Sequence, residues 1–221
     1  MKTILHAMKT QEPMSGLPEL LHCIVSHRDL HARLLNTLAR MEYVGVRKMV
    51  KARHSDFLTV DGLQHMLEES AHALRLKKYA IGLAESPGQV KTFSSEHTLG
   101  GDAGEQYLQD VDAACAKSLE DMKDPQKTEM NYLLSSAMIE FRAEVFYPVY
   151  EDCLRKTGAS FSISAILKDE ERHLAQMIQS LEAHCPDWEV RCKAVQQAEA
   201  AAFSHWMKGV SESVEHALAV I

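Results

Sequence analysis

The sequence predicts an all-α protein: a four-helix bundle with a long crossover between its second and third helices and an added C-terminal helix. Apolar residues recur at steps of three and four over long stretches, which is the period of an α-helix. The 10 glycines and 6 prolines cluster between these stretches, where they mark turns and helix ends. A chain of 221 residues can build a substantial core, so residues 1–221 are expected to form one domain.

The first helix pair is predicted at residues 17–54 and 59–83. Glu42 falls on the inward face of the first helix, and Glu69 falls on the inward face of the second. Thr59 is a residue type that caps helix N-termini, which places the start of the second helix. Because the loop between them is short, the two helices should run antiparallel.

A long connection, residues 85–125, follows the first pair. Pro87-Gly88 and Gly100-Gly101 predict turns within it, and a short helix is expected at residues 104–122. Its length allows the second helix pair to pack beside the first.

The second pair is predicted at residues 126–156 and from 163 to about 182, so the bundle should span residues 17–182. Gly158 suits the left-handed position that ends a helix. After Pro186 a fifth helix is expected at residues 189–216, which either covers the bundle or forms a homodimer.

Composition narrows the classes of function. The net charge of −7 argues against a protein that holds nucleic acid through bulk charge. No apolar run approaches the roughly 20 residues that cross a bilayer, and the apolar stretch at the N-terminus is too short for a signal peptide. We therefore expect a cytoplasmic protein without membrane contact. The five cysteines form no Cys-x-x-Cys pair, so reduced and mostly buried thiols are expected.

A doubled motif carries the functional prediction. Glu69-Ser70-Ala71-His72 recurs as Glu170-Glu171-Arg172-His173, so Glu-x-x-His occurs twice. Arg40-Met41-Glu42 precedes the first copy, and Arg142-Ala143-Glu144 precedes the second. The two Arg-x-Glu glutamates lie 27 and 26 residues before the glutamates of the motifs.

Helix geometry brings these residues to one level of the core. Residues i and i+3 share a helical face, so Glu69 and His72 can point at the same ion. Counting along each antiparallel pair places Glu42 near Glu69 and Glu144 near Glu170. Four buried carboxylates without compensation would be strongly destabilising, and bound cations are the natural compensation. Carboxylate and imidazole ligands suit Fe(II) and Mn(II) and, less specifically, Zn(II).

This layout resembles the ferritin-like di-iron carboxylate proteins, in which two helices each supply a Glu and two others each supply Glu-x-x-His. The resemblance covers roughly residues 30–180. It implies two Fe ions, or a Mn/Fe pair, with a bridging role for the Glu of each motif. The metal ligands that it implies are Glu42, Glu69, His72, Glu144, Glu170 and His173.

Two positions stay open. Glu140 lies one turn before Glu144 on the same stripe, so it is an alternative or an additional ligand, an acid that supports the ligands, or a partner of Arg142 or another cation. The Arg-x-Glu repeat favours Glu144. His65 lies one turn before Glu69, where it either supports the ligands, lines a substrate cavity or is an ordinary core histidine.

The resemblance implies an O2-activating oxidase or oxygenase that acts on a small organic substrate. O2 would be the co-substrate, and an external electron donor would be needed. The alternatives are iron handling, as ferroxidase or store, peroxide scavenging, and a helical binding protein without turnover. Aldehyde-deformylating oxygenases, quinone-ring hydroxylases and tRNA-modifying hydroxylases all fit this size, and the acidic balance weighs against tRNA.

Overall fold

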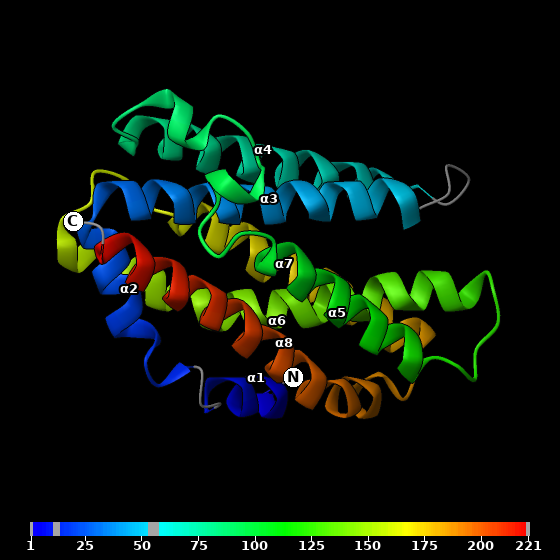
Figure 1. Ribbon diagram of the computed structural model, residues 1–221. Helices are drawn as coiled ribbons and strands as arrows, with labels where there is room; N and C mark the ends of the chain where they lie inside the picture. The colour runs from blue at the N-terminus through cyan, green and yellow to red at the C-terminus, as the bar shows by residue number, and fades with distance from the viewer. Residues whose placement is uncertain (1, 11–13, 53–57, 220–221) are drawn as a thin grey trace.

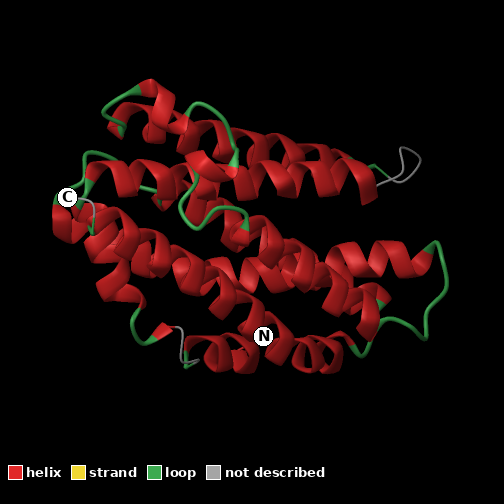
Figure 2. Cartoon of the chain, viewed as in Figure 1, coloured by secondary structure: helices red, strands yellow, loops and turns green. Residues whose placement is uncertain are grey.

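The computed structural model describes residues 2–10, 14–52 and 58–219, and within them all regular structure is helical (Figure 2). This confirms the all-α prediction. The helices are α1 (Lys2–Lys9), α2 (Leu17–Ser26), α3 (Arg28–Ala52), α4 (Val60–Leu83), α5 (Ala103–Ser118), α6 (Gln126–Thr157), α7 (Ser164–His184) and α8 (Trp188–Leu218), with short 3-10 turns η3 (Pro87–Val90) and η4 (Ser95–His97). None of the described helices is both long and apolar enough to cross a membrane.

The helix predicted at residues 17–54 is wrong as a single element, because it breaks at His27. There the backbone is extended, with φ −116° and ψ 109°. Side chains satisfy the last carbonyls of α2: Ser26 Oγ donates to His22 O at 2.8 Å, and His27 Nδ1 lies 2.8 Å from Cys23 O. Such local bonds compete with helix continuation, and α3 then starts afresh.

The remaining helix boundaries agree closely with the prediction. Thr59 caps α4, since its Oγ1 accepts a hydrogen bond from the Gly62 amide at 3.2 Å. Gly158 ends α6 with φ 68° and ψ 32°. The predicted loop at residues 55–58 lies outside the described residues except for Leu58. Helix α1 was not predicted; its Ile4 and Met8 are buried, and it packs on α6 and α8.

The helices pair as Figure 1 shows. α3 packs along α4, and α6 packs along α7, while α5 lies against α8 and α6. The C-terminal helix α8 packs on α5, α1 and α6, and its Phe203 and Trp206 are buried with Tyr107 and Phe146. A salt bridge of 2.7 Å between buried Arg142 and Glu199 ties α6 to α8.

The crossover is fixed at defined points. Gly100 has φ +81°, and an added Cβ would lie 3.1 Å from a methyl group of Val210 on α8, so a glycine is required there. Lys77 on α4 donates to the side chain of Asn36 and to the carbonyl of Val90, which holds η3 against the first helix pair. The cysteines are free and four of the five are buried, as predicted.

Candidate metal centre

Four helices bring seven Glu and His side chains, of the types that can hold a metal ion, to one level of the core. They fall into two groups, in each of which the potential ligand atoms lie within 4.8 Å of one another. One group is His65, Glu69, Glu140 and His173; the other is Glu42, Glu69, His72 and Glu170. Glu69 belongs to both, so the two groups adjoin.

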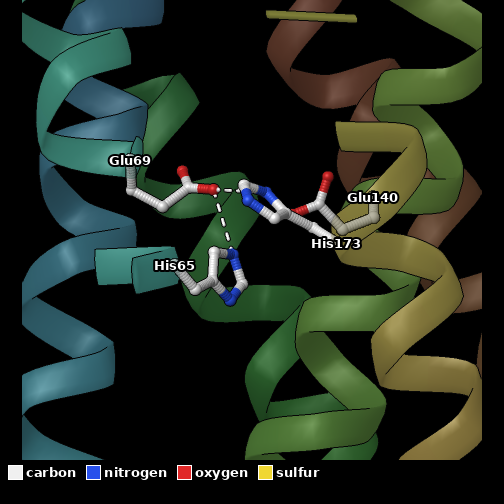
Figure 3. A group of neighbouring side chains, drawn as sticks. All are labelled: His65, Glu69, Glu140 and His173. Atoms are coloured by element: carbon white, nitrogen blue, oxygen red, sulfur yellow. Dashed lines mark hydrogen bonds and ion pairs between the residues drawn. The ribbon is translucent and has the colours of Figure 1, made fainter. Parts of the chain in front are cut away.

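The first group is shown in Figure 3. Glu69 Oε1 lies 3.1 Å from His65 Nε2 and 3.1 Å from His173 Nδ1, and the two imidazole rings are 3.9 Å apart between centroids. Glu140 reaches the same point from α6. His173 is fully buried and the other three are at least nine-tenths buried. Two imidazoles and two carboxylates therefore converge on one small volume.

The second group is built around Glu170. Its Oε1 lies 3.1 Å from His72 Nδ1, and its Oε2 lies 3.2 Å from His173 Nδ1. One carboxylate therefore faces the imidazole of each Glu-x-x-His motif. Glu42 completes this group, and Tyr147 donates a 2.7 Å hydrogen bond to Glu42 Oε1.

Two atoms of this cluster lack the partners that burial normally demands. His72 Nδ1 and Glu170 Oε1 are shielded from solvent, and neither makes a hydrogen bond within the described residues. They lie 3.1 Å apart, but their relative orientation is not that of a hydrogen bond. Buried polar atoms are rarely unsatisfied, and a site for an ion is one explanation when they are. The donor set therefore fits a bound cation.

A carboxylate stands behind each motif histidine. His72 Nε2 lies 3.1 Å from Asp169 Oδ2, and His173 Nε2 lies 2.8 Å from Glu68 Oε2. Arg172 bridges these carboxylates, at 2.8 Å from Glu68 and 3.2 Å from Asp169. A bond of this kind fixes which ring nitrogen carries the proton and leaves Nδ1 free to bind metal. Glu68 directly precedes Glu69, and Asp169 directly precedes Glu170, so each motif begins after an acidic residue that contacts the histidine of the other motif. This repeated acidic residue is visible in the sequence but was not among the predicted site residues.

The electrostatics of the cluster without metal depend on protons. Burial raises the pKa of Glu42 and Glu140 well above the usual value, and the charges of Glu69 and Glu170 raise it further. Burial alone would lower the pKa of His173. Hydrogen bonds to Glu170, Glu69 and Glu68 outweigh burial and raise the pKa of His173 to about 10. Protons thus offset the negative charge, and a metal ion would displace them.

The structure brings together five of the six residues predicted as ligands, and Glu144 is the exception. Glu144 is half-buried and belongs to neither group. Glu140, one turn earlier, lies at the position in the cluster that the Arg-x-Glu repeat predicted for Glu144. The charges that act on Glu144 belong to Glu171, Lys9 and Glu170, which places it toward α1. The height of α7 relative to α6 depends on the path of the non-helical segment 158–163. Counting residues along the sequence does not determine that path.

A cavity of about 110 Å³ adjoins the cluster. The four cluster glutamates line it together with apolar and aromatic side chains, among them Leu38, Phe146 and Trp206. For scale, a cavity of about 150 Å³ in another protein holds benzene. The space therefore suits O2 or a molecule of a few heavy atoms.

Comparisons of the chain with known protein families, with curated proteins and with solved structures gave no match. The interpretation of the site therefore depends on its own geometry.

Proposed function

We propose that this chain is a dinuclear metal protein of the ferritin-like di-iron carboxylate class, and that it is an O2-activating oxidase or oxygenase of a small organic substrate. The observation that carries the proposal is the pair of adjoining ligand groups, which share Glu69 and contain the unsatisfied atoms His72 Nδ1 and Glu170 Oε1. Carboxylate and imidazole ligands favour two Fe ions or a Mn/Fe pair. A bundle of α3, α4, α6 and α7 would then be the ferritin-like core.

The roles of the ligands follow from their contacts. Glu69 belongs to both groups and Glu170 faces both motif histidines, so these two carboxylates would bridge the ions. Glu42, which accepts a hydrogen bond from Tyr147, would serve one ion as a terminal ligand, and Glu140 would serve the other.

Each ion has its own imidazole set. His72 would bind one ion, whereas His65 and His173 would bind the other, which makes the centre asymmetric. When bound, the metal pair supplies the electrons and the open positions for O2 reduction. The chain supplies the rest: carboxylates behind His72 and His173 hold the rings, and the apolar wall of the cavity excludes water from the substrate.

Anaerobic titration with Fe(II), followed by metal analysis, tests the metal centre. We expect two ions per chain, and fewer than one in a His72→Ala/His173→Ala variant, because each group loses an imidazole. A His184→Ala variant is the matched control, since His184 is an exposed histidine of α7. A wild-type chain that binds no metal would refute the proposal.

Oxygen uptake by the iron-loaded protein tests the activity. With a chemical reductant and O2, we expect consumption of O2 that ceases in the double-histidine variant. Iron oxidation that ends in an iron(III) mineral inside a large shell would favour iron storage instead. Two bound ions without any O2 consumption would leave a metal site and contradict an oxygenase.

A further inference from the structure

A row of large apolar side chains is exposed along the outer face of α4. This outer stripe consists of Val60 (79 % exposed), Leu63 (54 %), Leu67 (69 %), Leu74 (56 %) and Ile81 (44 %). α4 packs on α3 and α7 with its other faces, and it lies at the edge of the molecule (Figure 1). Single exposed apolar residues are ordinary, but five of them on one face of one helix mark an interaction surface.

The spacing of the stripe is that of a helix that packs on another helix. Val60, Leu67, Leu74 and Ile81 are seven residues apart, the repeat that keeps one seam facing a partner helix. At 1.5 Å per residue, the row runs for about 32 Å. Its centre is occupied by the small exposed residues Ser70 and Ala71.

The charges beside the stripe are divided between its ends. Asp61 lies exposed at the N-terminal end, Arg75 lies exposed toward the C-terminal end, and exposed Lys78 lies within the stripe between Leu74 and Ile81. If a second α4 packs antiparallel with the midpoint at Ser70 and Ala71, Val60 faces Ile81 of the copy and Leu67 faces its Leu74. Leu63 then lies level with Lys78 of the copy, whose aliphatic stem can pack on it while the ammonium group reaches water. The acidic end of each helix then meets the basic end of the other. A parallel arrangement would place like charges together, which is unfavourable.

We propose that α4 is the contact of a twofold homodimer, in which two copies of this chain pack their outer stripes antiparallel. A twofold contact must be complementary to itself, and the stripe meets that condition in the spacing of its apolar residues and in the division of charge between its ends. The small residues at its midpoint allow the two helices to approach closely where they cross. Ser70 and Ala71 are also the two middle residues of the first Glu-x-x-His motif, so the contact would form directly behind Glu69 and His72. This inference is independent of the proposed function.

The mass of the full chain in solution tests the proposal. At micromolar concentrations, light scattering after gel filtration should give twice the mass of one chain. A Leu67→Glu/Leu74→Glu variant should give the mass of one chain, with an unchanged far-UV circular dichroism spectrum because both side chains are exposed. Val190→Glu on α8 is the matched control, since Val190 is 67 % exposed, and should leave the dimer intact. A monomeric wild type, including one that binds another protein or a lipid vesicle, would overturn the proposal, and so would a dimer that persists in the double variant.

Cysteine cross-linking tests the orientation of the two helices with single substitutions at the midpoint and at the ends of the stripe. In the antiparallel arrangement, Ser70→Cys lies near the twofold axis and should form an intermolecular disulfide under mild oxidation. Val60→Cys should not cross-link with itself, but it should cross-link with Ile81→Cys when the two variants are mixed. The wild type, with its own five cysteines, is the control for background. Self-cross-linking of Val60→Cys, or none by Ser70→Cys, would overturn the antiparallel dimer.

Discussion

At the scale of single residues, the position of one carboxylate decides how the second half of the metal centre is built. Glu140 is 8 % exposed and lies within ligand distance of Glu69 and His173, whereas Glu144 lies outside both groups. Both residues sit on the same face of α6, so only their height along the helix separates them. A ligand of the proposed centre must lie at the level of the other ligand atoms, which Glu140 does.

We expect Glu140→Gln and Glu144→Gln to differ sharply in metal binding. Glu140→Gln should lower occupancy of one of the two sites, because a neutral amide replaces a carboxylate ligand. Glu144→Gln should keep two ions per chain, which makes it the matched control one turn away. Metal analysis after anaerobic Fe(II) loading measures both. Full occupancy in Glu140→Gln together with loss in Glu144→Gln would restore the assignment that the sequence repeat favoured.

The same pair shows what sequence alone could predict about the site. Glu69, His72, Glu170 and His173 are fixed to each other by helical spacing within a motif, and the structure brings all four together. Glu42 also follows, since few residues separate its helix from α4 in the sequence. Glu140 could not be chosen in advance, because its height depends on the path of residues 158–163. His65 could not be assigned either, since its convergence with His173 is a contact between two helices.

At the scale of helices, buried polar contacts hold elements together outside the metal centre. His31 on α3 lies 2.7 Å from the hydroxyl of Tyr150 on α6, and its ring stacks on Phe161 of the following segment. His31 therefore connects α3 with α6 and with the segment that contains Phe161. The break between α2 and α3 at His27 lies one helical turn before His31. The apolar period continues through residues 17–54, so it does not indicate this break.

His31 should make folding stability depend on pH. Burial lowers the pKa of His31 to about 4, against about 6.5 in an unfolded chain. Between these values the unfolded chain binds more protons, so stability rises with pH. The shifted pKa of His31 contributes on the order of 3 kcal/mol to the free energy of unfolding. This contribution is complete above pH 6.5 and is lost as pH falls through 4.

Urea unfolding of the wild type and of His31→Gln at several pH values measures this effect. The stability advantage of the wild type should shrink as pH falls from 7 to 4, because glutamine does not titrate. His205→Gln, at an exposed position of α8, should keep the wild-type profile. Parallel profiles for wild type and His31→Gln would contradict the role assigned to His31.

At the scale of the whole molecule, the candidate metal centre lies between the two helix pairs. α3 contacts mainly α4, and α6 contacts mainly α7, while contacts between the pairs are fewer. The ligands come from both pairs, with Glu42 and Glu69 on one and Glu140 and Glu170 on the other. A bound ion would therefore join the pairs and replace the protons that hold the cluster without it.

Metal binding should consequently stabilise the entire fold. A ligand that binds only the folded chain adds about 2.7 kcal/mol at a free concentration 100 times its dissociation constant. With two such sites, anaerobic Fe(II) or Mn(II) should raise the midpoint of thermal unfolding by several degrees, and a chelator should reverse the rise. Because the ligands join both pairs, unfolding should remain a single transition when the metal is bound. The His72→Ala/His173→Ala variant should show little response to metal. An equal rise in that variant would place the stabilising ions elsewhere, and no rise in the wild type would contradict a metal centre that joins the two pairs.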